Sequence, residues 1–198
     1  KDTNNLVSIY IEVNKSRRLG KGGRPLSDTL CCGMSCIDIL TGENCIYEHF
    51  SESDDSAIAY DEIQKFITVK NPKEILINAD GLNMDIDEIY TFFNLKNQTS
   101  RINMEGIDRK KKKVKFQQEL LKKIFFPEQS SNTSISSNIN IFEKLNITHK
   151  IFGRLSYIVL LEYIYEHCNS ILNNLDYPDI WESNEYLMLA NNALEQLN

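Results

Sequence analysis

The sequence lacks a long apolar run, a secretory signal and any recognisable nucleophile–base pair. No segment of about 18 consecutive apolar residues occurs, so we expect no transmembrane helix and no membrane partner. The N-terminal residues do not show the charged and apolar regions of a signal peptide. None of the three histidines lies in a serine or cysteine signature of covalent catalysis, so this class of hydrolase finds no support.

Cysteine spacing also argues against a zinc site. The five cysteines form no C-x-x-C pair, and His49 and His167 have no ligand-like spacing. Four of the cysteines lie where we expect β-structure, which is typical of buried, reduced thiols in an intracellular protein: Cys31, Cys32, Cys36 and Cys45. We therefore expect no metal and an intracellular location, without distinguishing nucleus, cytoplasm, viral factory or organelle.

The composition is that of an ordinary globular domain. Of 198 residues, 41% are hydrophobic and 25% charged, which is enough for one domain with a short appended piece. The net charge of -6 means that any contact with nucleic acid must come from a local basic patch. The sequence opens on Lys1 and ends inside an expected helix over residues 186–197, so we expect a piece of a longer protein.

Periodicity predicts an α/β domain with a mixed sheet flanked by helices. Residues 6–13 alternate between apolar and polar, which indicates a strand. Turn chemistry at residues 41–44 predicts a hairpin between strands 30–40 and 45–50. The remaining expected elements are a helix over 56–70, a buried strand over 74–78, a helix opening at Asp85, a strand near 100–104, and helices over 114–126 and 151–175.

A Gly-rich loop at residues 20–23 has the composition, but not the setting, of a phosphate-binding loop. Such a loop needs a strand before it and a helix N-terminus after it, whereas here a strand follows. We interpret the basic segment 14–29 that contains it as a hairpin connection, and the polar segment 130–140 as a second loop.

Three acidic residues lie on or beside the expected strands, namely Glu12, Asp38 and Asp80. Strand ends near a topological switch are common places for active sites in α/β sheets. Three acids that met there could hold Mg²⁺ for phosphodiester cleavage. The alternative is that Asp38 and Asp80 flank turns and that Glu12 lies on a solvated face.

A basic run begins shortly after the last expected strand and consists of Arg109, Lys110, Lys111, Lys112 and Lys113. Such a run could contact DNA phosphates through counterion release, or an acidic partner surface. Positive charge at the start of a helix opposes the helix dipole, and no aromatic residues are interleaved for base stacking. A solvated junction between loop and helix is therefore the competing interpretation.

Several segments, in order, resemble the connector domain of MutS-type DNA mismatch-repair proteins. Residues 33–43 (GMSCIDILTGE) resemble its G-x-x-x-x-D-x-x-T-G-E stretch, in which a strand turns into a hairpin. Residues 63–66 (IQKF) and 71–76 (NPKEIL) are similar to the helix and strand entry that follow. The helix over 151–175 resembles the one that closes the connector, and residues 185–198 resemble the start of the lever/core region.

The resemblance implies a ribonuclease H-like fold without its active site, with a C-terminal helical extension. It implies a connector domain (domain II) over residues 1–176 and the start of the lever/core region over 177–198. The basic segment 14–29, the lysine run and the Ser/Asn-rich loop depart from the usual connector, which indicates a divergent branch of viral or organellar origin.

The leading functional hypothesis is therefore a non-catalytic connector, not itself an enzyme. It would link the mismatch-binding and ATPase regions of the parent protein and dock partners of the MutL type. The resemblance implies no cofactor in this piece. It assigns ATP, Mg²⁺, mismatched double-stranded DNA and dimer formation to the parent, an ATPase. The alternative is a metal-dependent nuclease domain of ribonuclease H-like fold.

Overall fold

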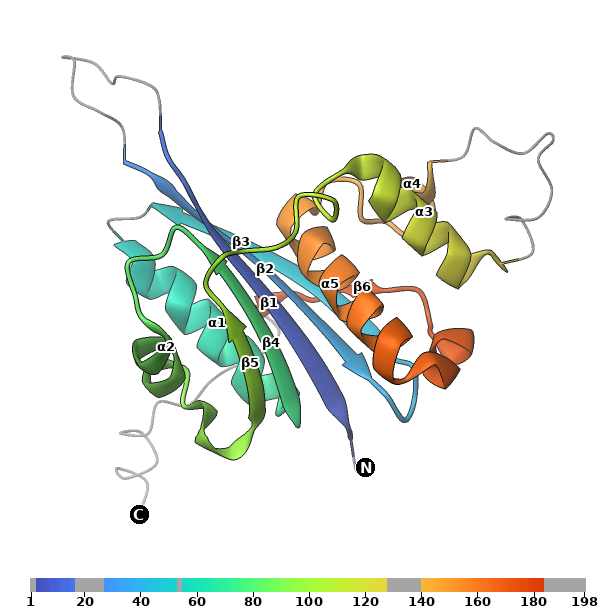
Figure 1. The fold of residues 1–198 in the computed structure, drawn as a ribbon, viewed down its shortest axis with the longest axis horizontal. Helices are drawn as coiled ribbons and strands as arrows, with labels where there is room; N and C mark the ends of the chain where they lie inside the picture. Colours follow the sequence, from blue (N-terminus) through green and yellow to red (C-terminus); the bar gives the residue numbers. More distant parts are fainter. Residues whose placement is uncertain (1–2, 17–26, 53–54, 128–139, 184–198) are drawn as a thin grey trace.

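A computed structural model describes residues 3–16, 27–52, 55–127 and 140–183. Six strands form one sheet in the order β5-β4-β1-β2-β3-β6 (Figure 1). The strands are β1 (Asn5–Asn14), β2 (Thr29–Asp38), β3 (Asn44–Glu52), β4 (Glu74–Asp80), β5 (Thr99–Asn103) and β6 (Asp179–Ile180).

The strand directions confirm the expected ribonuclease H-like arrangement. Strands β1, β2 and β3 form an antiparallel meander, while β4 and β5 run parallel to β1 on its other side. A mixed sheet with β1 between an antiparallel and a parallel neighbour, and with helices on both faces, is the fold class predicted from the sequence.

Helices cover both faces of the sheet and leave its central strand buried on both sides (Figure 1). One face carries α1 (Ser56–Lys70) and α2 (Ile86–Phe92); the other carries α3 (Val114–Phe125), α4 (Ile141–Lys144) and α5 (Ile151–His167). Tyr10 of β1 is fully buried in the cluster that includes α5, and Ile9 and Ile11 are fully buried in the cluster that includes α1.

Helix α5 approaches the sheet closely because two glycines lie at the contact. A Cβ on Gly33 of β2 would lie 1.9 Å from the carbonyl oxygen of Phe152, so no larger residue fits without a shift of backbone. The close approach lets Ser156 donate to the carbonyl of Ser8 at 2.7 Å and share a 2.9 Å hydrogen bond with Ser35. These bonds satisfy polar groups inside the core.

One predicted helix ends earlier in the structure, and one short strand was not predicted. The long helix predicted over 151–175 ends at His167, and the 3₁₀ helix η4 (Asn169–Asn174) follows it. Asn and Ser compete with the backbone for hydrogen bonds and so favour caps and turns over helix interiors. Strand β6, which the sequence did not predict, pairs with β3 and buries Trp181 to 5% exposure. The boundary at residue 176 stays a prediction.

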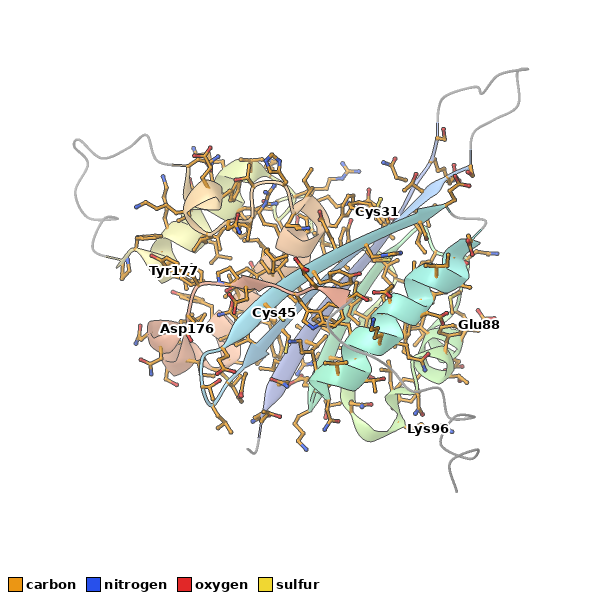
Figure 2. All side chains as sticks on the ribbon, turned by 180° about the vertical axis from the view of Figure 1, so that it is seen from behind. Cys31, Cys45, Glu88, Lys96, Asp176 and Tyr177 are labelled. Atoms are coloured by element: carbon orange, nitrogen blue, oxygen red, sulfur yellow. The ribbon has the colours of Figure 1, made fainter. Side chains whose placement is uncertain are left out.

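The described cysteines are free, and four are buried, as expected: Cys31, Cys32, Cys36 and Cys45. Figure 2 labels two of them, Cys31 and Cys45. In the described part of the chain no helix has the length and apolarity needed to cross a membrane. The predicted helix over 186–197, the Gly-rich loop at residues 20–23 and nearly all of the Ser/Asn-rich loop lie outside the described residues.

Candidate functional site

Two of the predicted acids meet at one edge of the sheet. Glu12 and Asp80 lie on the neighbouring parallel strands β1 and β4 and are partners in register. Asp80 is the last residue of β4, and Glu12 lies near the end of β1. The carboxyl ends of adjacent parallel strands therefore bring both side chains to the same place, where α/β sheets commonly bind ligands.

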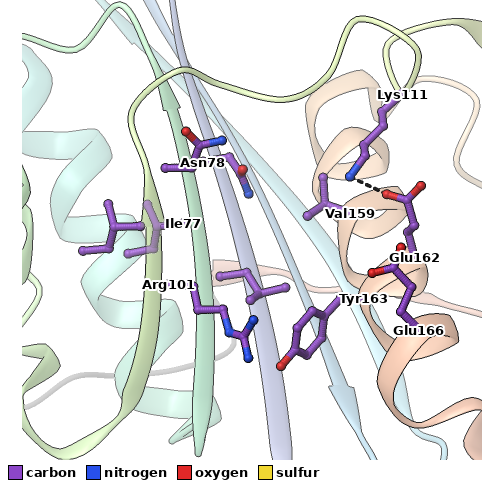
Figure 3. Close-up of a pocket in the computed structure, with 11 residues that line it drawn as sticks. Ile77, Asn78, Arg101, Lys111, Val159, Glu162, Tyr163 and Glu166 are labelled. Atoms are coloured by element: carbon purple, nitrogen blue, oxygen red, sulfur yellow. Dashed lines mark ion pairs between the residues drawn. The ribbon is translucent and has the colours of Figure 1, made fainter.

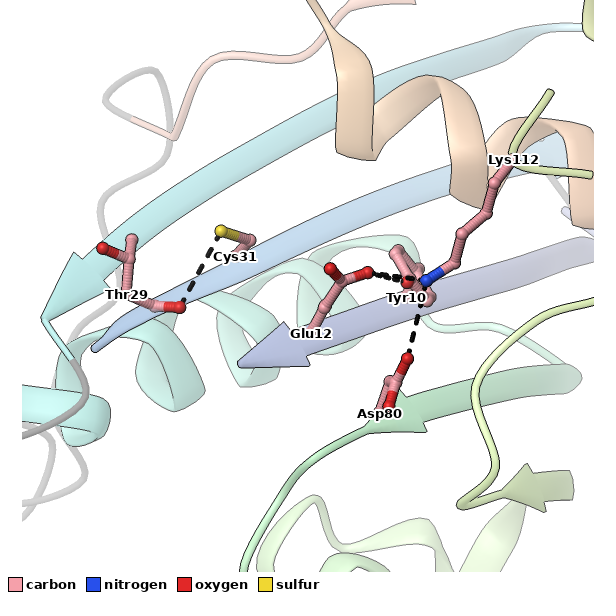
Figure 4. Close-up of polar contacts among 6 residues, drawn as sticks. All are labelled: Tyr10, Glu12, Thr29, Cys31, Asp80 and Lys112. Atoms are coloured by element: carbon pink, nitrogen blue, oxygen red, sulfur yellow. Dashed lines mark hydrogen bonds and ion pairs between the residues drawn. The ribbon is translucent and has the colours of Figure 1, made fainter. Parts of the chain in front are cut away.

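A lysine lies between these carboxylates (Figure 4). The Lys112 Nζ is 2.9 Å from Glu12 Oε2 and 3.5 Å from Asp80 Oδ2, and it lies 5.4 Å from the centre of the Tyr10 ring. The Tyr10 hydroxyl donates a hydrogen bond to the same oxygen of Glu12. We call these four residues the acid–lysine cluster. Its charged side chains keep 28% to 47% of their surface exposed, so a ligand in solution can reach them.

Burial and hydrogen bonding set the protonation of the cluster. Burial alone would raise the pKa of Glu12, but hydrogen bonds from Tyr10 and Lys112 outweigh it and hold the pKa below its ordinary value. Burial and the bond to Glu12 raise the pKa of Tyr10. Burial would lower the pKa of Lys112, yet its contacts with Tyr10 and Glu12 raise it. Near neutral pH the cluster thus holds an ionised Glu12, a neutral phenol and an ammonium group.

The turn after β5 passes close to the Asp80 side chain at a glycine, Gly106. Gly106 has φ of 76°, and a Cβ added there would lie 3.0 Å from Cβ of Asp80 and 3.1 Å from its Oδ2. Its carbonyl accepts a 2.8 Å hydrogen bond from Asn103 Nδ2, which fixes the turn after β5. A side chain at position 106 would press on the carboxylate, so glycine is needed here for both conformation and space.

Two buried side chains, Gln117 and Arg154, hold the segment that carries Lys112 by hydrogen bonds. We call residues 109–113 the lysine turn. The Gln117 Nε2 of α3 donates to the carbonyl of Lys111 at 2.8 Å, and its Oε1 accepts from Arg154 Nε at 2.8 Å. Gln117 and Arg154 are 2% and 6% exposed. Because α5 supplies the arginine, the position of the lysine turn depends on the helix that packs on the sheet.

The structure divides the predicted basic run into two groups. Lys111 and Lys112 are half-buried in ion pairs, Lys111 with Glu162 and Lys112 with the two acids. The others are exposed and make no ion pair with any described residue: Arg109, Lys110 and Lys113. Lys110 Nζ lies 4.7 Å from the centre of the Phe116 ring. Contact of this run with DNA or with an acidic partner stays a prediction.

The third predicted acid lies elsewhere. Asp38 is in register with Asn5, seven residues before Glu12 on β1, so it lies about 23 Å along the strand from the cluster. It is 5% exposed, and its Oδ1 accepts from the backbone amides of Asn4 at 3.3 Å and Leu40 at 2.9 Å. The prediction of a three-acid site is therefore wrong for Asp38, because antiparallel pairing places this turn-flanking acid at the opposite end.

Sequence reasoning missed the role of Lys112 and Tyr10. Lys112 was assigned to a basic run on the strength of its neighbours, and nothing in that run distinguishes it from Lys110 or Lys113. Tyr10 and Glu12 are two residues apart in the alternating segment 6–13 and therefore share a strand face, and this spacing is the signal that could have joined them. Only the packing of the lysine turn over β1 reveals the contact.

A small cavity of about 240 Å³ lies beside the cluster, between β4, β5 and α5 (Figure 3). Asn78 of β4, Arg101 of β5 and Tyr163 of α5 line it, with Lys111 and Glu162 at its upper end. Arg101 is already engaged: it pairs with Glu74 at 3.3 Å and lies 5.1 Å from the Tyr163 ring centre. Apolar side chains complete the lining, Leu76 and Val159 among them.

The acid pair fits a divalent cation only in part. Within the described ranges, no group of three or more His, Cys, Asp or Glu side chains is placed to hold a metal ion. Mg²⁺ is nevertheless often held by one or two carboxylates together with substrate phosphates. Glu12 and Asp80 meet that requirement if a phosphate completes the site and Lys112 gives way.

Comparison with known proteins gives one curated relative and several solved structures. No family profile matches the sequence. The chain is 28% identical over 211 residues to a putative DNA mismatch-repair protein, a MutS homolog, of Acanthamoeba polyphaga mimivirus. That match covers 100% of this chain but 18% of the relative, so the chain spans under a fifth of the length of that protein.

The solved structures with a similar arrangement share little sequence with this chain. The fowlpox virus resolvase in complex with Holliday junction DNA is 12% identical, with a TM-score of 0.39; the match covers 82% of this chain and 99% of that one. The RuvC protein of T. thermophilus with a Holliday junction substrate is 6% identical, with a TM-score of 0.33, and covers 81% and 94%.

These matches correct one expectation from the sequence. We expected the chain not to be an enzyme, whereas the solved chains that are similar to it are resolvases, which are enzymes by name. The absence of catalysis is therefore not retained. The activity and the MutS-type membership of this chain are both proposals.

Proposed function

We propose that this domain processes DNA as a metal-dependent phosphodiesterase, with Glu12 and Asp80 as its metal-binding pair. The observation that carries the proposal is their register: two carboxylates lie on adjacent parallel strands at the carboxyl edge of a ribonuclease H-like sheet. Both are exposed enough to meet a substrate, at 28% and 47% of their side-chain surface.

Each residue of the site has a definable task. Glu12 and Asp80 would hold the cation, and the Tyr10 hydroxyl fixes the position of Glu12 Oε2 by donating a hydrogen bond to it. When bound, Mg²⁺ supplies an activated water and stabilises charge on the phosphate. Arg109, Lys110 and Lys113 are the exposed cations of the lysine turn and would bind the DNA backbone through counterion release.

The test is cleavage of end-labelled duplex, mismatched and branched DNA, with and without Mg²⁺ or Mn²⁺. We expect metal-dependent cleavage that Glu12→Gln and Asp80→Asn each reduce by at least a hundredfold, because each removes a charged ligand while keeping the shape. Asp38→Asn is the matched control, since the same chemical change at the far end of the sheet should leave cleavage unaltered. Cleavage that survives both substitutions, or no cleavage of any substrate, would refute the assignment.

A second proposal concerns the protein to which the domain belongs. The match with the mimivirus MutS homolog covers the whole of this chain, which supports a domain of a MutS-type DNA repair protein. In such a parent it would link the mismatch-binding and ATPase regions and dock a MutL-type partner, and the parent would bind ATP, Mg²⁺ and mismatched DNA as a dimer. This role is compatible with local chemistry at the acid pair.

Docking can be tested with the immobilised domain. A purified MutL-type protein should be retained by the domain and released by a surface substitution that leaves the melting temperature unchanged. Lys110→Glu with Lys113→Glu is the first pair to try, because both side chains are exposed and the sequence offers an acidic partner as one occupant of this run. A MutL-type protein that passes through the column would count against the docking role.

A further inference from the structure

We infer that Lys112 and a divalent cation compete for Glu12 and Asp80, and that DNA phosphates favour the cation by drawing Lys112 away. The inference rests on the proposed function and adds an order of binding to it: DNA prepares the metal site. In this scheme the Lys112 ammonium group stays in its ion pairs with Glu12 and Asp80 until DNA binds.

The competition follows from the geometry of the cluster. The Lys112 Nζ lies 2.9 Å from Glu12 Oε2 and 3.5 Å from Asp80 Oδ2, so it occupies the space between the two oxygens. A Mg²⁺ ion bound to a carboxylate lies about 2.1 Å from its oxygen and keeps near-octahedral ligands around it. An ammonium group and a divalent ion cannot both fill that space, and their like charges repel each other.

The lysine side chain can leave while its backbone stays. The backbone of the lysine turn is held by Gln117, whose Nε2 donates to the carbonyl of Lys111 at 2.8 Å, and by its own turn bonds. The Lys112 side chain is 34% exposed and has a flexible four-carbon stem. Each partly exposed ion pair favours the bound position of the Lys112 side chain by a factor of only about 1.4 to 5. A phosphate that offers Lys112 a new ion pair can offset the preference from two such pairs.

DNA would arrive on the same turn. Lys110 and Lys113 flank Lys112 within three residues and are exposed. Phosphates bound there would lie within reach of Lys112 and offer it a new anionic partner. By linkage, any factor by which DNA raises the affinity for the metal must equal the factor by which the metal raises the affinity for DNA.

The experiment measures Mn²⁺ binding to the 198-residue chain by titration calorimetry and by the paramagnetic resonance signal of free Mn²⁺. Titrations are made with and without a short duplex whose phosphodiesters are replaced by non-cleavable analogues. The variants are Lys112→Gln and Lys112→Met, the second of which keeps an unbranched stem over the Tyr10 ring. Lys96→Gln is the matched control, because it removes the same charge from an exposed side chain outside the lysine turn without touching the acids.

We expect Lys112→Gln and Lys112→Met to bind Mn²⁺ about tenfold more tightly than the unmodified chain when DNA is absent. Lys96→Gln should change this affinity less than threefold. Duplex DNA should raise the affinity of the unmodified chain several-fold and that of the Lys112 variants by much less. Equal effects of substitution at 112 and 96, or weaker Mn²⁺ binding after loss of Lys112, would overturn the inference.

The same samples separate this inference from the proposed function. If Mn²⁺ binding follows Lys112 as expected but cleavable DNA stays intact, the phosphodiesterase assignment fails and the competition stands. If DNA is cleaved while Mn²⁺ affinity ignores Lys112, the competition fails and the assignment stands. Glu12→Gln combined with Asp80→Asn must abolish the Mn²⁺ binding in either case, since otherwise the metal is held elsewhere.

Discussion

The contact between Gly33 of β2 and helix α5 gives a sharp test of how the core is packed. A Cβ added at Gly33 would lie 1.9 Å from the carbonyl oxygen of Phe152 and 2.2 Å from the carbonyl carbon. Both atoms belong to the backbone, so no side-chain rotation can relieve the overlap. Strand and helix would have to separate by about 1.5 Å to reach an ordinary contact distance of about 3.5 Å.

We expect Gly33→Ala to lower the free energy of unfolding by about 3 kcal/mol, the upper end of the usual cost of overpacking. For a chain of this size, about 2–4 °C of melting temperature corresponds to each kcal/mol, so the loss should be about 6–12 °C. Circular dichroism melts at matched concentration provide the measurement. Hydrogen exchange at the amides of α5 would show whether the helix is the part that yields.

Gly153→Ala is the paired control on the other side of the same contact. Its added Cβ would lie 2.4 Å from Cγ2 of Ile46, a side-chain atom and not a backbone atom, and 3.0 Å from the carbonyl oxygen of Tyr47. Alanine also favours a helix over glycine by about 1 kcal/mol, which offsets part of the strain. We expect a net cost of about 1 kcal/mol. The reasoning fails if Gly33→Ala melts within about 2 °C of the unmodified chain, or if Gly153→Ala is the more damaging change.

Three further substitutions address the site and the helix that supports it. Tyr10→Phe removes a hydrogen bond that lowers the pKa of Glu12, so the pKa of this carboxyl in the folded protein should rise, which an NMR titration would show. Ionised Glu12 contributes stability above its unfolded pKa, and on acidification the variant should lose this stability at a higher pH than the unmodified chain. Gln117→Leu leaves Arg154 short of an acceptor and should cost about 1–3 kcal/mol, with faster amide exchange in the lysine turn and not in β3. Ser156→Ala removes two buried hydrogen bonds and should cost about 1–3 kcal/mol in urea unfolding, with no change in Mn²⁺ binding.

The sheet was predictable from the sequence because its signals are local. Residues 6–13 alternate, the T-G-E turn closes a hairpin, and residues 74–78 form an apolar run of the length of a buried strand. Strand β6 has two residues and pairs with β3 across more than 130 positions. No periodicity can appear in so short a segment, and its pairing depends on packing of Trp181, which only the tertiary structure provides.

The candidate site was predictable only in part, for a related reason. Glu12 and Asp80 were recognised as strand-end acids, and parallel pairing brings them together. Asp38 was grouped with them as another acid near a strand end, although the hairpin between β1 and β2 places the end of β2 opposite the start of β1, away from Glu12. Lys112 reaches the acids because the segment between β5 and α3 passes over the sheet, and residue spacing does not predict the path of such a loop.

The buried thiols give this chain a set of unfolding reporters that needs no engineering. Burial raises the pKa of Cys32 to about 12 and that of Cys31 to about 11, and it also raises the pKa values of Cys36 and Cys45. Alkylating reagents react with the thiolate, so these four positions on the central hairpin should stay unlabelled until the sheet opens. Cys168 is partly exposed just beyond α5 and supplies an internal reference. Mass spectrometry after a pulse of iodoacetamide would therefore count how many molecules have opened the hairpin, and it would do so for every variant above under identical conditions.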